Sequence, residues 1–299
     1  MKRTVTLFMY AIFIVAILAG CGAQGNNSDS AKNGNEFDIS REIHVISREE
    51  GSGTRGAFVE LFGIQQKDSS GNEIDYTTEE ARIVNNTAVM MTSVAGDKYS
   101  IGYISLGSLN DTVKALKIDG VEPTADNVKS GEYKIARPFI IATKGEISKV
   151  VQDFVEFIMS SDGQKVVEEN GYIPVSDNPA YSGDKPSGKI VIAGSSSVYP
   201  IMEKLKEAYL AINSNAQIEV QQSDSTTGIN SVIDGICDIG MSSRELKESE
   251  LNAGLNPITI AMDGLVVIVN KGNPADNLTS EQVRAIFTGE ITRWSEVLE

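Results

Sequence analysis

Histidine and cysteine are scarce in this chain of 299 residues: there is one histidine, His44, and there are two cysteines, Cys21 and Cys237. A single histidine makes a histidine-based metal centre or a Ser-His-Asp triad hard to build. Two cysteines cannot form a disulfide framework. The sequence also lacks a Gly-x-Ser-x-Gly elbow, so its serines have no evident route to activation as nucleophiles. These absences argue against a hydrolase and against a metal-stabilised domain.

Basic residues are also few. The chain has 26 Lys and Arg against 41 Asp and Glu, and its formal net charge is −15 at pH 7. Broad electrostatic attraction to nucleic acid or to acidic membranes is therefore not expected. Apolar residues make up 41% of the chain and charged residues 22%, which is typical of a soluble globular body with one large domain or two smaller ones.

One long apolar run is present, at residues 4–20, directly after Lys2 and Arg3. A basic start followed by a short apolar core is typical of a secretory signal. The segment 18–21 (LAGC) resembles the bacterial lipobox, in which the cysteine is acylated and the chain is cut before it. We therefore expect residues 1–20 to be a lipoprotein signal peptide and Cys21 to be the lipidation site. An uncleaved anchor or an ordinary signal is the alternative.

The next stretch, residues 21–40, is rich in Gly, Asn and Ser and has no apolar period, so it predicts a flexible tether. We expect a protein anchored by lipid on the extracytoplasmic face of the cell membrane. Cys237 then has no partner, and a small buried residue is its simplest interpretation.

Three segments of the body share one pattern: a short apolar strand, a turn of Ser, Thr and Gly, and an amphipathic helix. They lie at residues 44–62, 190–208 and 218–233, and a related turn lies at 238–246. Alternation of strands and helices predicts an α/β architecture with ligand sites at the carboxyl ends of the strands.

These turns have two physical interpretations. Backbone N–H groups at a helix start lack intrahelical partners and carry partial positive charge, so they form a ready anion site. Serine and threonine at a helix start can equally be simple N-caps. Consecutive hydroxyls beyond what one cap requires favour the anion site, but the sequence leaves both interpretations open.

Between these segments the periodicity predicts further elements. Residues 171–187, rich in Gly, Pro, Ser and Asn, predict a surface connection. The expected helices cover residues 79–94, 150–159, 164–169 and 279–287, and the expected strands cover 101–106, 135–143 and 265–269.

Together the motifs resemble the PstS family, the phosphate-binding proteins of phosphate ABC importers. Five segments resemble the opening half of the sequence of that family: IAGSSSVYPIMEKLKEAY, IEVQQSDSTTGINSVIDG, DIGMSSRELKESEL, DGLVVIVNKGNP and LTSEQVRAIFTGEITRWSEV. Its closing half is resembled by VISREEGSGTRGAFVELFG, YSIGYISLGSL, ARPFIIATKG and NGYIPV. The resemblance covers nearly everything from residue 41 to residue 299.

The order of the two halves is reversed relative to the family. Circular permutation is the simplest account: the usual ends are joined through residues 176–187, and new ends open between Glu299 and Arg41. Permutation is tolerated where termini lie close together at the surface. A truncated tandem or a split gene is the alternative.

The resemblance implies a two-lobed periplasmic-binding-protein fold of type II, circularly permuted, that closes on its ligand. One lobe would be residues 41–133 plus 270–299, which carry the SREEGSGT motif. The other would be residues 134–269, which carry the GSSS, SDSTTG and SSREL motifs, with crossings near 136–143 and 266–271. It further implies a monomer without cofactor or metal that captures inorganic phosphate for a membrane ABC permease.

The positions that match the family's phosphate ligands come from both lobes. They are Ser196, Ser197, Ser225 and Ser243 from the second, and Arg48, Ser52, Gly53 and Thr54 from the first. Hydroxyls, backbone amides and one guanidinium suit phosphate, whose oxygens are nearly all acceptors.

One position departs from the family. Some members place an Asp where Ser243 falls, and that carboxylate accepts the proton of hydrogen phosphate, which excludes sulfate. A serine hydroxyl can also accept a hydrogen bond, and Glu49, Glu50, Asp224 and Asp263 are other candidates. The acceptor stays open.

Two other functions compete with phosphate import. One is an oxyanion-sensing or adhesive module that keeps the fold without transport. The other is an extracellular phosphoesterase that uses one of the serines, against which the lack of a usable histidine counts.

Overall fold

A nine-stranded sheet runs through the computed structural model, which describes residues 36–70 and 72–298. Its main path has the order β10-β9-β11-β8-β12-β5-β1-β4, and β6 pairs with β12 beside this path. These strands are β1 (His44–Arg48), β4 (Arg82–Val84), β5 (Ser100–Ser105), β6 (Lys114–Ala115), β8 (Ala136–Lys144), β9 (Gly188–Ser195), β10 (Ala216–Ser223), β11 (Ile239–Ser242) and β12 (Leu255–Val269). The smaller sheets pair β2 (Gln65–Lys67) with β3 (Glu73–Asp75), and β7 (Lys117–Ile118) with β13 (Asn277–Leu278).

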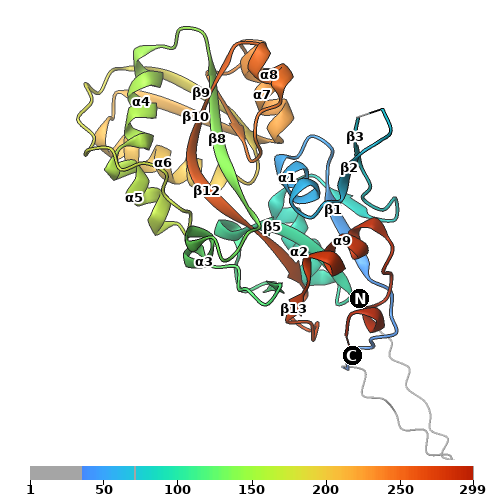
Figure 1. Ribbon diagram of the computed structural model, residues 1–299. Helices are drawn as coiled ribbons and strands as arrows, with labels where there is room; N and C mark the ends of the chain where they lie inside the picture. Colours follow the sequence, from blue (N-terminus) through green and yellow to red (C-terminus); the bar gives the residue numbers. More distant parts are fainter. Residues whose placement is uncertain (1–35, 71, 299) are drawn as a thin grey trace, which may run out of the picture. The chain divides into compact units, whose positions relative to one another are not determined.

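The α-helices of the described chain flank this sheet (Figure 1). They are α1 (Gly53–Leu61), α2 (Thr87–Gly96), α3 (Ala125–Ser130), α4 (Lys149–Met159), α5 (Ser161–Glu169), α6 (Tyr199–Ile212), α7 (Ser225–Ile233), α8 (Glu248–Asn252) and α9 (Ser280–Thr288). The α/β fold class expected from the sequence is confirmed.

The long strands β8 and β12 connect two groups of elements. They pair antiparallel from Leu255↔Lys144 to Gly264↔Ala136, and β12 then pairs with β5 from Leu265 onward. In Figure 1 the two strands run together from the β9 and β10 side to the β5 side. This pair is therefore the stretch of backbone that the two groups share.

The hydrophobic core is divided in the same way. The larger cluster on one side contains side chains of α1, β5, α9 and the end of β12. We call these elements, together with β1, β4 and α2, the β1 half. On the other side, side chains of β8, β9, α4 and α6 pack together, and with β10, β11 and α7 they form the β9 half. Leu265–Val269 pack in the β1 half, so the chain passes between the halves near Gly264.

Most elements expected from the sequence are present, but the helix expected at 79–94 is wrong. Residues 82–84 form strand β4 beside β1, and the helix begins only at Thr87. Asn86 marks the boundary because its side chain accepts a hydrogen bond from the Val89 amide and caps α2. The strand expected at 265–269 is the last part of the longer β12.

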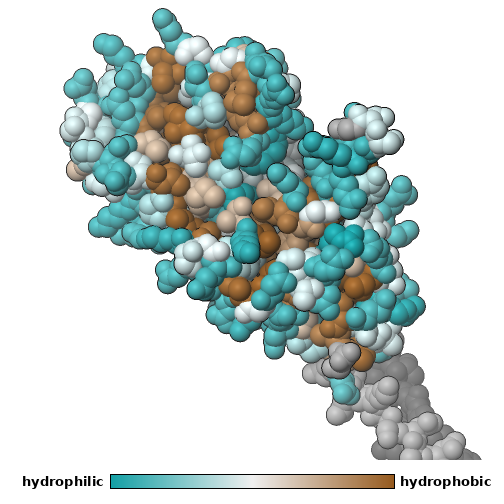
Figure 2. Space-filling model, in the orientation of Figure 1, coloured by the Kyte–Doolittle hydropathy of each residue, from teal (hydrophilic) through white to brown (hydrophobic). Residues whose placement is uncertain are grey.

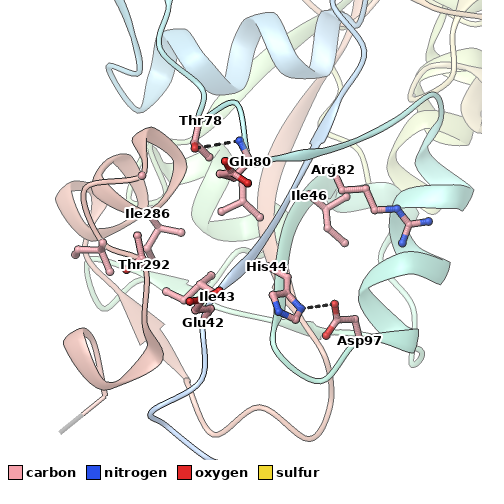
Figure 3. A pocket seen from close by; sticks show the side chains of 13 residues that line it. Glu42, Ile43, His44, Ile46, Thr78, Glu80, Arg82, Asp97, Ile286 and Thr292 are labelled. Atoms are coloured by element: carbon pink, nitrogen blue, oxygen red, sulfur yellow. Dashed lines mark hydrogen bonds and ion pairs between the residues drawn. The ribbon is translucent and has the colours of Figure 1, made fainter.

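Residues 41–43 lie beside residues 292–294. The Ile43 amide donates to the Thr292 carbonyl at 2.8 Å, and the Trp294 amide donates to the Arg41 carbonyl at 3.2 Å. A pocket of about 580 Å³ opens next to this junction, between β1 and the end of α9. Figure 3 shows Ile43, Ile46 and Ile286 around it, and His44 bound to Asp97 with 2.7 Å between Nδ1 and Oδ2.

The segment that follows α5 is held down by a buried carboxylate. Asp153 of α4 accepts hydrogen bonds from the hydroxyls of Tyr181 and Tyr209, at 2.5 and 2.6 Å. Residues 174–187 thus form most of the surface connection that the sequence predicts for 171–187, with Tyr181 anchored to the β9 half, whereas Tyr172 and Ile173 are buried.

Hydrophilic residues cover much of the face in Figure 2, and the apolar residues on it occur in groups separated by them. Among residues 36–70 and 72–298, none of the helices combines the length and the apolar character needed to cross a membrane.

Candidate functional site

The Ser- and Thr-rich turns meet where the β1 half and the β9 half face each other. Capping explains only part of their composition. Ser52 caps α1 by accepting from the Arg55 amide, but the cap of α7 is Asp224, and α6 has no side-chain cap. The hydroxyls of Ser196, Ser197 and Ser225 are therefore left for another purpose.

Hydrogen bonds join the two halves through these hydroxyls. Thr54 Oγ1 lies 2.7 Å from Ser197 Oγ, and the Nη2 group of Arg48 donates to Ser196 Oγ at 3.0 Å. The same Thr54 oxygen lies 3.5 Å from Ser243 Oγ. Residues 143 to 189 positions apart in the sequence thus share one small cluster, because β1 and β9 both end beside it.

Ser243 lies at the centre of the cluster on the β9 side. Its hydroxyl accepts from Ser195 Oγ at 2.9 Å and lies 3.4 Å from Ser225 Oγ, while its amide donates to Ser225 Oγ at 3.1 Å. Ser195 is not among the site residues expected from the sequence. These serines are at most 3% exposed. So dense a group of buried hydroxyls is costly to desolvate unless polar partners satisfy it.

Two glycines allow the halves to approach this closely. A Cβ on Gly53 would overlap Ser225 Oγ and lie 2.8 Å from Ser243 Oγ, and a Cβ on Gly51 would overlap the carboxylate of Asp224. The Thr226 amide donates to the Gly51 carbonyl at 3.2 Å. The β1–α1 turn and the start of α7 therefore make direct backbone contact.

A buried cation from the β1 half, Arg48, lies in the cluster. Arg48 is 2% exposed, and Glu49 chelates it, with 2.8 Å from Nε to Oε2 and 2.7 Å from Nη2 to Oε1. Because the guanidinium is balanced by this carboxylate, the pair carries no net charge. Neutral donors must then provide much of the attraction for an anion.

A second buried ion pair lies behind the cluster, on the strands that the halves share. The Nε and Nη2 groups of Arg137 each lie 3.2 Å from Asp263 Oδ2, and Nη1 donates to the Ser243 carbonyl at 3.2 Å. Burial raises the pKa of Asp263 to about 6, against the opposing effect of Arg137. Ser105 of the β1 half donates to Asp263 Oδ1 at 2.8 Å. From the sequence, Asp263 is expected only as a candidate proton acceptor, and Arg137 is not expected in the site.

Another residue missed from the sequence is Thr87, the first residue of α2. It is 5% exposed, and its Oγ1 lies 3.4 Å from both Ser196 Oγ and Ser197 Oγ. The wrong helix boundary concealed it, because a helix over residues 79–94 would have placed Thr87 in the middle rather than at the start.

Seven of the expected residues come together. Six of them meet through side-chain contacts, namely Arg48, Thr54, Ser196, Ser197, Ser225 and Ser243, and Gly53 joins them by close backbone approach. Ser52 is buried next to them, but its hydroxyl is occupied by the cap of α1. Cys21 lies outside the described residues. Within residues 36–70 and 72–298 there is no cluster of His, Cys, Asp and Glu suited to a metal ion.

Two α/β halves that share a pair of long strands, with buried polar groups at their contact, define a substrate-binding protein of the periplasmic type. The PBP superfamily domain matches residues 27–162 and 179–299. Phosphate-binding protein PstS 2 of Streptococcus agalactiae is 52% identical over 284 residues, which is 95% of this chain and 94% of that protein. The chain therefore belongs to the PstS family within this superfamily.

Two other relatives differ in how much they match. One is the crystal structure of a phosphate-binding protein of a phosphate ABC transporter from Streptococcus pneumoniae. Its sequence is 44% identical, its TM-score is 0.68, and the match covers 86% of this chain and 99% of that one. Phosphate-binding protein PstS of Bacillus subtilis is 34% identical over 139 residues, which is 46% of this chain and 43% of that protein. The resemblance expected from the motifs is thereby confirmed.

Proposed function

We propose that this protein captures inorganic phosphate outside the cytoplasmic membrane and hands it to an ABC permease. The observation that carries the proposal is the buried hydroxyl cluster with Arg48, to which both halves contribute. Phosphate is a compact anion whose oxygens accept hydrogen bonds from every side, so a ring of hydroxyl, amide and guanidinium donors suits it. Relatives named as phosphate-binding proteins support the same function.

The proposed phosphate ligands are the residues expected from the sequence. Arg48 and Thr54 would bind from the β1 half together with the turn of Ser52 and Gly53 at the start of α1. Ser196, Ser197, Ser225 and Ser243 would bind from the β9 half. The Ser52 hydroxyl caps α1 and its amide donates to the Glu49 carbonyl, so this turn would contribute through the amides of Gly53 and Thr54 at the helix start.

The β1 half and the β9 half are the proposed lobes, with their boundary at Gly264 rather than at residue 269, because Leu265–Val269 pack in the core of the β1 half. Bending of β8 and β12 would open the site. Hydrogen bonds between Thr54 and Ser197 and between Arg48 and Ser196 exist only when the lobes are closed, so they favour the closed state.

Isothermal titration calorimetry with phosphate at neutral pH tests the function. Saturable binding of one phosphate per chain is expected, with a higher melting temperature in phosphate as the linked effect. Absence of heat and of stabilisation would reject the proposal. Turnover of a chromogenic phosphate ester would instead favour a phosphoesterase, for which the cluster offers no histidine: His44 lies at the opposite end of β1 from Arg48.

We also propose that the chain order is a circular permutation. Three observations support it: the streptococcal relative matches over nearly its full length, the Bacillus subtilis relative matches over less than half, and residues 41–43 lie beside residues 292–294. The pocket of Figure 3 lies at that junction, where a connecting stretch would run in the usual order.

A relinked chain tests the permutation. It would begin at Ser182, end at Tyr181, and join residue 298 to residue 41 through about four Gly and Ser residues, each of which spans up to ~3.5 Å. We expect it to fold and to bind phosphate as the parent chain does, because circular permutation preserves the contacts of the core. Circular dichroism and calorimetry check this, and a relinked chain that stays unfolded would contradict the proposal.

We further propose that Cys21 carries the lipid that holds the protein to the outer face of the membrane. The apolar run at 4–20 and the LAGC segment support this assignment. The Cys21→Ser variant is expected to appear in the culture medium rather than in the membrane fraction, since the thiol is the acylation site. Immunoblotting of the two fractions decides it, and an unchanged distribution would show that another segment provides the anchor.

A further inference from the structure

Thr87 lies in the hydroxyl cluster without a role in holding α2. Asn86 provides the cap by accepting from the Val89 amide at 2.8 Å, so the Thr87 hydroxyl is not needed there. The residue is 5% exposed, and its Oγ1 faces Ser196 and Ser197 at 3.4 Å each. Burial of a threonine hydroxyl at the contact between the halves calls for a polar partner.

The carboxylates around the cluster are already occupied. Glu49 chelates Arg48 with both oxygens, Asp224 caps α7, and Asp263 belongs to the buried pair behind Ser243. The remaining candidate, Glu50, is exposed. Hydrogen phosphate carries a proton that needs an acceptor, and a hydroxyl oxygen can accept as well as donate. Since these carboxylates already hold structural contacts and Glu50 is exposed, a weakly engaged hydroxyl is the best-placed acceptor.

Among the hydroxyls, Thr87 is the least engaged. Ser196 accepts from the Arg48 guanidinium at 3.0 Å, and Thr54 and Ser197 share a bond of 2.7 Å. Ser243 accepts from Ser195, at 2.9 Å. Both contacts of Thr87 are near the upper limit for a hydrogen bond, so its lone pairs are free for a ligand proton.

We propose that Thr87 is a further phosphate-contacting residue, which accepts the proton of hydrogen phosphate and thereby separates phosphate from sulfate. This inference rests on the proposed function. The Thr87 hydroxyl would donate its own proton to Ser196 or Ser197, which leaves its oxygen to accept from the ligand. Sulfate is fully ionised at neutral pH and has no proton to donate, so it gains nothing from an acceptor at this position. A donor at the same position would serve both anions alike.

The test compares Thr87→Val, which removes the hydroxyl at nearly constant shape, with Thr87→Ser, which keeps it. Thr92→Val is the matched control, because Thr92 lies on the exposed face of the same helix. Phosphate affinity is measured by calorimetry, and sulfate affinity is measured directly or by competition with phosphate. Melting temperatures without ligand report whether each variant is folded, and Thr87→Ala replaces Thr87→Val if that variant is not.

We expect Thr87→Val to bind phosphate about tenfold more weakly, which corresponds to the loss of one net hydrogen bond. Its sulfate affinity should change by less than about threefold, and Thr87→Ser and Thr92→Val should stay close to the parent protein. Unchanged phosphate affinity, or an equal loss for both anions, would overturn the inference while leaving the proposed function in place. A parent protein that binds no phosphate would remove both.

Discussion

Gly53→Ala is expected to weaken phosphate binding by about a hundredfold while leaving the melting temperature of the free protein nearly unchanged. The added Cβ would overlap Ser225 Oγ and lie 2.8 Å from Ser243 Oγ, both in the opposite half. The overlap exists only when the halves are in contact. Since alanine is a better helix former than glycine, the start of α1 should not be destabilised in an open state. The substitution therefore acts on closure rather than on folding.

Gly56→Ala is the matched control for this variant. Gly56 lies one turn further along α1, and its new Cβ would meet only the flexible side chain of Arg244, at 3.4 Å from Cδ. Calorimetry should give parent-like affinity for Gly56→Ala, and small-angle scattering should show that Gly53→Ala stays expanded when phosphate is added. Parent-like affinity in Gly53→Ala would mean that ligand binding does not require the contact between the halves that the structure shows.

The clustering of the Ser-rich turns could be predicted from the sequence, because strand ends on one edge of a sheet bring their following turns together. Whether the hydroxyls of these turns cap helices or bind an anion could not be predicted from the sequence. It depends on which residue supplies each cap, and a neighbouring side chain can do so: Asp224 rather than Ser225 for α7, and Asn86 rather than Thr87 for α2. Only coordinates show which hydroxyls are left over.

Arg137 was beyond prediction for a different reason. Its partners Asp263 and Ser243 lie more than a hundred residues away, and β8 and β12 are paired in a register that the apolar pattern of either strand does not specify. The error at residues 79–94 has a local cause. Three residues of strand β4 are stabilised by pairing with β1, and such tertiary pairing overrides a weak helical period.

Arg48→Ala is expected to weaken phosphate binding by about ten- to a hundredfold, the range for a lost charge-assisted hydrogen bond. The variant removes the donor to Ser196 and also leaves the Glu49 carboxylate without its cation, close to where the anion would bind. Part of the loss of affinity should therefore come from repulsion between the Glu49 carboxylate and phosphate. Because Glu49 is 22% exposed, added salt should screen that part.

The Arg48→Ala/Glu49→Gln double variant separates the two contributions. If repulsion between Glu49 and phosphate matters, the double variant should bind phosphate more tightly than Arg48→Ala alone. Glu49→Gln alone should bind at least as tightly as the parent protein, because the positive charge of Arg48 is then no longer balanced. Calorimetry at low and high salt measures all four proteins. Equal affinity of the parent protein and Arg48→Ala would show that Arg48 serves only to pair with Glu49, and the neutral hydroxyls and amides would then bind the anion alone.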